Sequence, residues 1–137
     1  MTAEVFVDTS AWVAFFRPAD GRYRDAANVW QRFVEERTPL VTTDYVLDET
    51  VTFLVSHGGH AVSVTAGEAI FESPNTRMIF LGEQVIRAAW DRYRRFTDKE
   101  FSFTDVTSFL MMEQLGIRRA FTFDRHFSQA GFEVLSA

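Results

Sequence analysis

Hydrophobic and polar positions along the chain alternate between two periods, one typical of buried strands and one typical of amphipathic helices. Short apolar runs predict strands at residues 4–8, 40–42, 78–81, 119–123 and 132–135. Apolar residues spaced three and four apart predict helices at residues 9–16, 23–37, 44–57, 61–72, 83–96 and about 105–115. Residues 127–130 are predicted as a turn or short helix, and Asp44 is predicted to cap the helix at 44–57.

Regular alternation of short strands with helices indicates an α/β fold. Such chains use right-handed crossovers, which produce a mostly parallel sheet. We therefore expect a central sheet of four to five strands. The 137 residues are 47% hydrophobic and 15% aromatic, enough for one packed core, and no repeat or linker interrupts them. Residues 1–137 are accordingly predicted to form a single domain.

The composition excludes several kinds of chemistry. There are no cysteines, so disulfides, zinc–thiolate sites and thiol nucleophiles are ruled out. No apolar run approaches the roughly 20 residues that a membrane span needs. The first residues, Met1 to Glu4, lack the basic start of a signal peptide. These features predict a cytoplasmic protein that does not contact the membrane.

Acidic residues stand at positions where an α/β sheet commonly binds ligands. Asp8 ends the first predicted strand, Asp124 ends the apolar run at 120–123, and Asp105 opens a predicted helix. Ligands of open α/β sheets bind at the carboxyl ends of the strands, and unpaired buried carboxylates are costly there. Each acid alone has a structural explanation as a helix cap. Asp105, for example, forms a potential capping box with Ser102.

Glu49 is harder to explain as a surface residue. Tyr45 and Phe53 lie four positions to either side of it, which tilts its side of the helix inward. Its neighbour Asp48 has Asp44 at the corresponding position, which describes a solvated face. An inward glutamate needs a partner, and either an arginine or a bound cation would serve.

Taken together, the acids favour a metal site. Several carboxylates in one place would repel one another, and their pKa values would rise. One or two divalent cations remove that repulsion. Oxygen ligands suit Mg²⁺ or Mn²⁺, and two ions about 3.5–4 Å apart form the arrangement used in phosphodiester chemistry.

Four segments in order resemble the motifs of one family. They are residues 7–12 (VDTSAW), 46–50 (VLDET), 101–108 (FSFTDVTS) and 121–127 (FTFDRHF). With these segments the chain resembles PIN-domain ribonucleases, particularly the VapC-type toxins of type II toxin–antitoxin systems. The resemblance covers essentially the whole chain. It implies a three-layer α/β/α domain with a mostly parallel central sheet.

The resemblance also implies functional residues. Those matching the family's catalytic, metal-binding acids are Asp8, Glu49, Asp105 and Asp124. Ser10 and Thr122 resemble polar residues that orient water or a carboxylate at the substrate. Asp98 resembles an acid that is common before the third motif. His126, between two phenylalanines, is expected to be a packing or surface residue rather than a catalytic one.

The implied activity is metal-dependent cleavage of RNA. One or two Mg²⁺ or Mn²⁺ ions would activate a water for in-line attack, leaving 5′-phosphate and 3′-hydroxyl ends. The implied partners are an RNA substrate and a cognate antitoxin, with a homodimer or a toxin–antitoxin hetero-oligomer as the assembly. No membrane partner is expected.

Net charge is −5, which argues against broad coating of a nucleic-acid backbone but not against a nucleic-acid substrate. Thirteen of the fourteen basic residues are arginines, which bind phosphate in a bidentate manner. The candidates for contacting RNA are Arg119 and Arg125, with Arg118 beside them. A second arginine cluster, at residues 92–95, is better explained as a solvated helix face.

Two other functions compete. A receiver-like phosphoacceptor domain also places acids at strand ends, but it needs a lysine after a later strand, and Lys99 instead precedes a helix. A haloacid-dehalogenase-type phosphatase needs Asp-x-Asp, whereas Asp8 is followed by Thr9 and Ser10. A non-catalytic PIN-like binding module stays open as the alternative.

Overall fold

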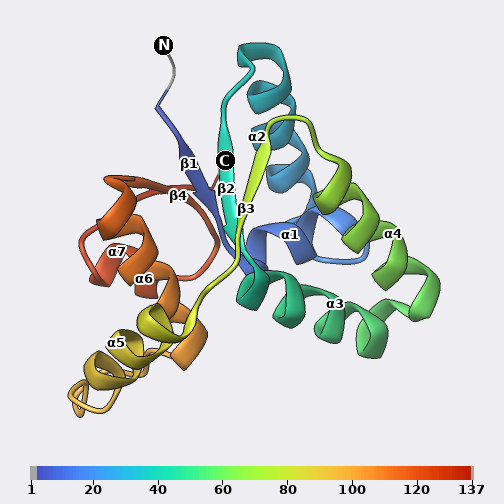
Figure 1. Cartoon of the computed structure of the whole chain (residues 1–137). Coiled ribbons are helices and arrows are strands. Elements are labelled where there is room, and N and C mark those ends of the chain that lie inside the picture. Colours follow the sequence, from blue (N-terminus) through green and yellow to red (C-terminus); the bar gives the residue numbers. More distant parts are fainter. Residues whose placement is uncertain (1–2, 137) are drawn as a thin grey trace.

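The computed structural model describes residues 3–136 and contains a five-stranded sheet in which every neighbouring pair of strands is parallel. The strand order is β3-β2-β1-β4-β5, with β1 at the centre (Figure 1). The strands are β1 Val5–Val7, β2 Leu40–Thr43, β3 Thr76–Ile79, β4 Arg119–Phe121 and β5 Glu133–Leu135. The predicted α/β class, with a parallel sheet, is confirmed.

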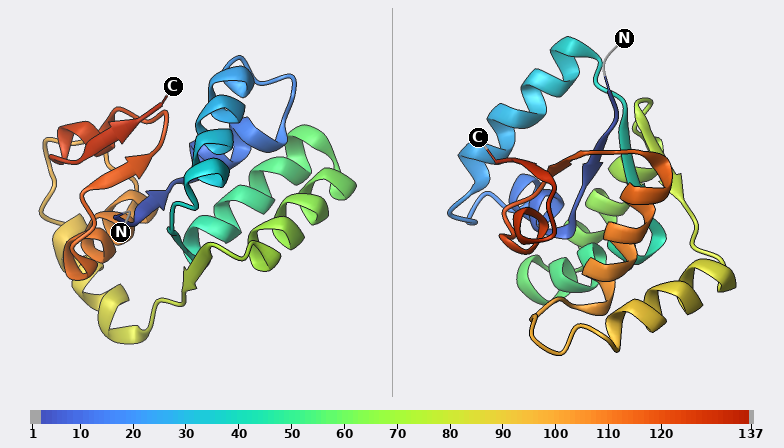
Figure 2. Two further views of the ribbon diagram at one scale, coloured as in Figure 1. Left: turned by 90° about the horizontal axis from the view of Figure 1, so that it is seen from above. Right: turned by 90° about the vertical axis from the view of Figure 1, so that its left-hand side faces the viewer.

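Helices cover both faces of this sheet, which gives three layers. Helices α1 to α4 gather on one side and α5 to α7 on the other (Figures 1 and 2). Their bounds are α1 Thr9–Phe16, α2 Tyr23–Glu36, α3 Asp44–Gly58, α4 His60–Glu72, α5 Glu83–Tyr93, α6 Phe103–Leu115 and α7 His126–Gln129. Among residues 3–136, none of these helices is long and apolar enough to cross a bilayer.

The central strand β1 fixes where the site forms. Its three residues, Val5 to Val7, are fully buried between β2 and β4. Val7 pairs in register with Phe121, so β1 and β4 end at the same level. Because both strands run in the same direction, the residues that follow them meet at one edge of the sheet. Asp8 lies at this edge, directly after β1, and its backbone N–H donates to the Phe121 carbonyl at 3.0 Å.

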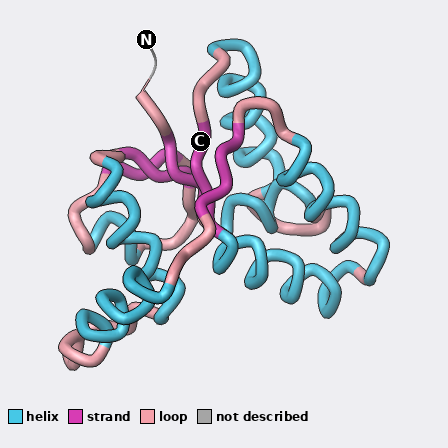
Figure 3. The backbone as a smooth tube through the Cα atoms, viewed as in Figure 1, coloured by secondary structure: helices cyan, strands magenta, loops and turns pink. Residues whose placement is uncertain are grey.

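Most predicted elements form, with shifted ends (Figure 3). The third strand was predicted at 78–81 but runs from Thr76 to Ile79 at the edge of the sheet. Phe80 is 68% exposed, and the Leu81 N–H donates to the Asp44 carboxylate at 3.0 Å, so this segment has left the sheet. The strand predicted at 119–123 ends at Phe121.

Two helix ends also differ from the predicted ones. The helix predicted at 83–96 ends at Tyr93 and is followed by a turn. Asp44 was predicted to cap α3, but the cap is Thr43, whose hydroxyl accepts the Val46 N–H at 3.1 Å. The Asp44 side chain instead accepts the Leu81 N–H and ties the chain beyond β3 to the start of α3.

Candidate active site

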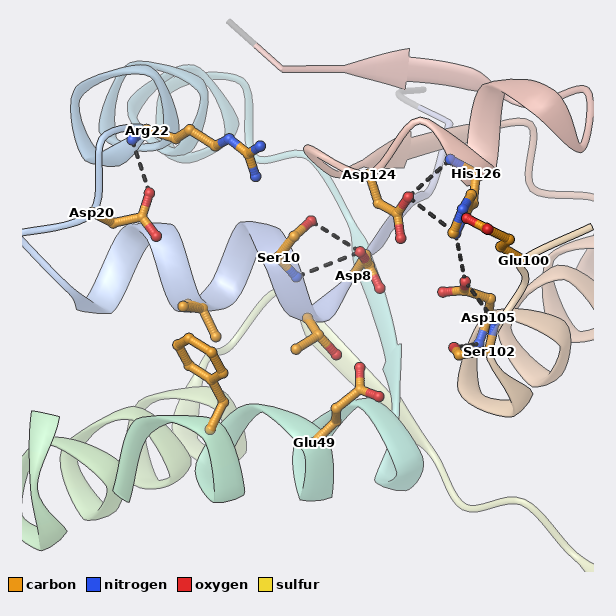
Figure 4. Close-up of a pocket in the computed structure, with 13 residues that line it drawn as sticks. Asp8, Ser10, Asp20, Arg22, Glu49, Glu100, Ser102, Asp105, Asp124 and His126 are labelled. Atoms are coloured by element: carbon orange, nitrogen blue, oxygen red, sulfur yellow. Dashed lines mark hydrogen bonds and ion pairs between the residues drawn. The ribbon is translucent and has the colours of Figure 1, made fainter. Parts of the chain in front are cut away.

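A pocket of about 390 Å³ opens at the carboxyl edge of the sheet (Figure 4). The four acids selected from the sequence all line it: Asp8, Glu49, Asp105 and Asp124. They come from four separate segments: the end of β1, α3, α6 and the loop after β4. Folding therefore brings the predicted acids together at one site.

Asp8 is the most buried of these acids, with 4% of its surface exposed. It caps α1, and its carboxylate accepts hydrogen bonds from the hydroxyls of Ser10 at 3.0 Å and Thr122 at 2.9 Å. Burial raises the pKa of Asp8 to about 6, and the negative charge of Asp105 acts in the same direction. The hydroxyl donors oppose this shift because they stabilise the ionised form.

Ser10 and Thr122 join the first and last motifs. The Ser10 hydroxyl accepts the Phe123 N–H at 2.9 Å, and the Thr122 hydroxyl accepts the Asp124 N–H at 3.0 Å. The two hydroxyls are themselves 3.1 Å apart. Each hydroxyl thus holds the Asp8 carboxylate on one side and the backbone of the Asp124 loop on the other. Their position supports the expected role of orienting a carboxylate.

Asp105 acts both as a helix cap and as a site acid. Its carboxylate accepts the Ser102 N–H at 3.1 Å, while the Ser102 hydroxyl accepts the Asp105 N–H at 3.0 Å. This is the capping box predicted from the sequence. The capping box fixes the Asp105 side chain at the N-terminus of α6. Burial raises its pKa, and the nearby charge of Asp124 raises it further.

His126 lines the pocket, at a position where the sequence predicted a packing or surface residue. Its Nδ1 is 3.0 Å from Asp105 Oδ2 and 3.3 Å from Asp124 Oδ1. Its backbone N–H also donates to Asp124 Oδ1 at 2.9 Å, and its ring meets Phe101 edge-on. The signal available in the sequence was its position two residues after a candidate acid, where a tight turn brings both side chains together.

Glu49 reaches the pocket from the opposite wall. It is exposed, and Figure 4 shows its carboxylate pointing from α3 toward Asp8. Two further acids, Asp20 and Glu100, line the pocket but were not selected from the sequence. Asp98 was selected as a possible family acid, yet it does not line the pocket and lies 3.9 Å from Lys99.

The arginines predicted to contact RNA do not line the pocket. Arg119 is the first residue of β4 and pairs in register with Val5, so it lies at the amino edge of the sheet. Its guanidinium donates to the Ala3 carbonyl at 3.3 Å. Arg125 is exposed and does not line the pocket. Sequence spacing placed Arg119 near a motif, but strand direction carried it to the other end of the sheet.

The arginine cluster at the end of α5 is a solvated face, as favoured from the sequence. Arg92 pairs with Glu113 of α6, and Arg94 pairs with Asp91 one turn away. Arg95 pairs with the same aspartate. These ion pairs lie on the outside of the molecule and contribute little to stability.

The donor set of the pocket fits a divalent cation. Asp105, Asp124 and His126 each offer one ligand atom, and these atoms lie within 4.8 Å of one another. Carboxylate oxygens suit Mg²⁺ and Mn²⁺, and imidazole nitrogen is accepted by transition metals. Asp8 is buried beside Asp105, and a cation would offset both charges.

Comparison with known proteins defines the class. The model of the PIN-domain family matches residues 5–133 of this chain. The chain therefore belongs to the PIN-domain family. Its parallel sheet, its three layers and the acidic pocket at the carboxyl edge agree with the expected PIN-like architecture.

Within this family the chain is a homologue of VapC proteins. It is 38% identical over 129 residues to the 23S rRNA-specific endonuclease VapC20 of Mycobacterium tuberculosis, covering 93% of this chain and 95% of the relative. It is 28% identical over 124 residues to a VapC ribonuclease of Archaeoglobus fulgidus, covering 89% and 78%. The crystal structure of M. tuberculosis VapC20, described as a sarcin–ricin loop cleaving toxin, matches with a TM-score of 0.83 at 36% identity, covering 93% and 95%.

Proposed function

We propose that this chain is a Mg²⁺- or Mn²⁺-dependent endoribonuclease that acts as the toxin of a toxin–antitoxin pair. The observation that carries the proposal is the convergence of Asp8, Glu49, Asp105 and Asp124 on one pocket, in a fold shared with VapC20 over 93% of the chain. Acids from four segments at a sheet edge are a poor way to stabilise a fold, because they repel one another. They are a good way to hold hard cations at a phosphodiester.

The pocket residues divide the work between holding cations and orienting the acids. The four acids would hold one or two ions. A bound cation would acidify a coordinated water and offset charge on the phosphate. Ser10 and Thr122 orient the Asp8 carboxylate and favour its ionised form. His126 keeps Asp105 and Asp124 together from the side facing Phe101. No protein nucleophile is required, in keeping with a chain without cysteine.

The proposed substrate is a single-stranded loop of a structured RNA. VapC20 is named for action on 23S rRNA, and its structure is described as that of a sarcin–ricin loop cleaving toxin. We extend that substrate class to this chain on the basis of 38% identity over nearly the full length. RNA loops expose unstacked bases and bent backbone, which a concave site can recognise.

The alternatives are less well supported. A phosphoacceptor domain would need a lysine at the acids, but Lys99 is exposed and does not line the pocket. A non-catalytic module would not need Asp8 to stay an acid in a buried position that raises its pKa. The retained acids therefore favour catalysis.

The antitoxin and the assembly are part of the same proposal. The VapC family membership supports a small protein partner that blocks the acidic pocket, with a homodimer or a hetero-oligomer as the functional unit. Expression of the chain alone should arrest growth, and co-expression of the adjacent small reading frame should relieve the arrest. Growth that is unaffected by the chain alone would contradict the toxin role.

RNA cleavage tests the enzymatic proposal directly. Wild-type protein should cleave ribosomal RNA in Mn²⁺ and not in EDTA, and sequencing of the ends should find 5′-phosphates. Asp8→Asn should reduce cleavage by at least 100-fold, because it removes charge from the proposed metal site. Asp98→Asn is the matched control, since it removes the same charge outside the pocket. Full activity of Asp8→Asn would overturn the mechanism.

A further inference from the structure

The pocket is strongly asymmetric in charge. Six of its lining residues are acids and one is an arginine, Arg22, which immediately precedes α2. RNA is a polyanion, and a cation held by the acids would compensate for only the phosphate next to it. A neighbouring phosphate that enters the same pocket needs another positive group. Among the lining residues Arg22 alone supplies a permanent one.

The backbone of Arg22 is fixed while its guanidinium is available. Its N–H donates to the Asp20 carboxylate at 2.8 Å, and the Tyr23 N–H donates to the Asp20 carbonyl at 3.0 Å, so the chain is held before α2 begins. The guanidinium carbon lies 5.4 Å from the centre of the Phe123 ring. Within residues 3–136 the Arg22 side chain forms no ion pair with the pocket acids. In Figure 4 it extends toward Ser10 and Asp124.

The lining of the pocket also includes an apolar surface. It is formed by Val13 of α1 and Phe53 of α3. The Phe53 ring is stacked on His57 at 3.9 Å with 6° between the planes, yet Phe53 remains 37% exposed. An aromatic ring that borders a charged pocket offers a surface for a nucleobase, because every base has an apolar face.

We infer that Arg22 and Phe53 form a nucleotide subsite beside the acids. Arg22 binds the phosphate adjacent to the one that is cleaved, and Phe53 contacts the base of that nucleotide. The inference rests on the proposed function and gives a structural reason for its substrate class, because a base that reaches Phe53 must be unstacked from its neighbours. The subsite therefore selects single-stranded or looped RNA over a regular duplex.

The alternative is that Arg22 only packs on Phe123. A packing role would lower the melting temperature of an Arg22 variant without a specific loss of RNA affinity. Arg22→Gln separates the two roles, since glutamine keeps part of the hydrocarbon stem over the ring and removes the charge. Arg24 provides a matched control: it is exposed, lies two residues away and lines a different pocket.

The test measures binding apart from cleavage. Fluorescence anisotropy follows a labelled RNA hairpin with the sarcin–ricin loop sequence in Ca²⁺ over a range of salt concentrations. Arg22→Gln and Arg22→Ala should each weaken binding roughly tenfold or more, because a charge-assisted contact is lost. The salt dependence of log Kd should fall by about 0.7 for the one lost phosphate contact. Arg22→Lys should recover part of the affinity, and Arg24→Ala should change it less than about twofold, as expected for a surface charge.

Phe53 is tested in the same assay with a different signature. Phe53→Ala should weaken binding by about fivefold or more with an unchanged salt dependence, because stacking involves no counterion release. Phe71→Ala is its control, since Phe71 is 60% exposed on α4 and does not line the pocket.

Two patterns overturn the inference. One is equal affinity of the Arg22 and Arg24 variants, including the case in which no protein binds the hairpin. The other is a loss of affinity fully explained by unfolding in thermal melts of both Arg22→Gln and Arg22→Ala. Cleavage of ribosomal RNA by the wild-type protein, measured in parallel with Mn²⁺, reports on the proposed function by itself. Cleavage that persists while binding ignores Arg22 would refute the subsite alone.

Discussion

At the scale of single residues, Asp8 shows how the site balances burial against charge. Asp8 follows the central strand, where burial shields it from water and raises its pKa to about 6. Two hydroxyls, from Ser10 and Thr122, partly restore the hydrogen bonds that water would have made. A cation ligand must be deprotonated, so these donors favour metal binding at neutral pH.

Removing one of these hydroxyls should weaken metal binding. In Thr122→Val the methyl group that replaces the hydroxyl cannot donate to Asp8 or accept the Asp124 N–H. We expect Mn²⁺ affinity to fall about 10- to 100-fold, as for other groups that orient metal ligands. Isothermal titration with Mn²⁺ measures the change, and Thr122→Ser, which keeps the hydroxyl, should stay near wild type. Equal affinity of the two variants would show that Thr122 does not position Asp8.

At the scale of elements, α6 brings its acid to the pocket through its own first turn. Ser102 and Asp105 satisfy each other's backbone N–H groups, so the helix start and the site share one carboxylate. The same arrangement appears at α1, where Asp8 is both helix cap and site acid. Carboxylates that satisfy helix starts near the carboxyl edge of the sheet thus also line the pocket.

Breaking the capping box should affect both properties. Ser102→Ala removes the hydroxyl that accepts the Asp105 N–H, which should lower the free energy of unfolding by about 1 kcal/mol. Asp105 also loses its anchored geometry, so Mn²⁺ should bind more weakly. Urea unfolding and the Mn²⁺ titration follow the two effects, with Thr104→Ala as the control in the same turn. Identical behaviour of these variants would refute the coupling between cap and site.

At the scale of the whole molecule, the pocket buries carboxylates close to one another, which disfavours their ionised forms. Asp8 and Asp105 both have raised pKa values, each because of burial first and a neighbouring acid besides. A carboxyl with a raised pKa binds protons more strongly in the folded state than in the unfolded state. Its contribution to stability is therefore present at low pH and lost as the pH rises through the folded-state pKa.

This linkage predicts that Asp8→Asn stabilises the metal-free protein at neutral pH. In EDTA the variant and the wild type should be similar near pH 4, where Asp8 is largely neutral. The difference should develop between the ordinary pKa of 3.8 and about 6 and reach about 2–3 kcal/mol in favour of the variant at pH 7.5. Urea unfolding at several pH values measures it. A variant less stable than wild type at pH 7.5 would contradict the expectation that ionised Asp8 destabilises the metal-free protein.

Divalent metal should offset that difference. An ion that binds only the folded state adds about 2.7 kcal/mol at 100 times its Kd. Wild-type protein should therefore melt at a higher temperature in Mn²⁺, and Asp8→Asn should lose most of the increase. Asp48→Asn, next to Glu49 but on the solvated side of α3, should keep it. Differential scanning fluorimetry is sufficient, and a Mn²⁺ response of equal size in both variants would place the ion elsewhere.

Local sequence patterns correctly predicted the elements whose burial follows from their own hydrophobic periodicity. The buried run around Phe6 predicted β1, and the Ser102–Asp105 spacing predicted the cap of α6. Patterns failed where the neighbours decide the outcome. Phe80 reads as part of a buried strand, yet it is 68% exposed because β3 is an edge strand and the chain turns off toward Asp44.

The same division holds at the site. Asp8, Glu49, Asp105 and Asp124 could be selected from the sequence: Asp8 and Asp124 end apolar runs, Asp105 opens a helix, and Glu49 has aromatic residues four positions to either side. The other residues that lie beside these acids in the pocket could not be predicted, because their positions depend on distances across the fold. His126 and Arg22 join the site through turns whose geometry no periodicity encodes. Arg119 lies outside the site because it begins β4, a strand's length away from the sheet edge where β4 ends.

The sequence by itself determined the type of nearly every element, the parallel α/β architecture and the identity of the principal acids. These depend on hydrophobic period, turn residues and chain order, all of which are local properties. Only the tertiary structure decided which charged groups share the pocket, how strongly Asp8 and Asp105 hold their protons and which arginine faces the acids. Those properties depend on burial and on distances between segments remote in the chain, which arise when the register of β1 against β4 is set.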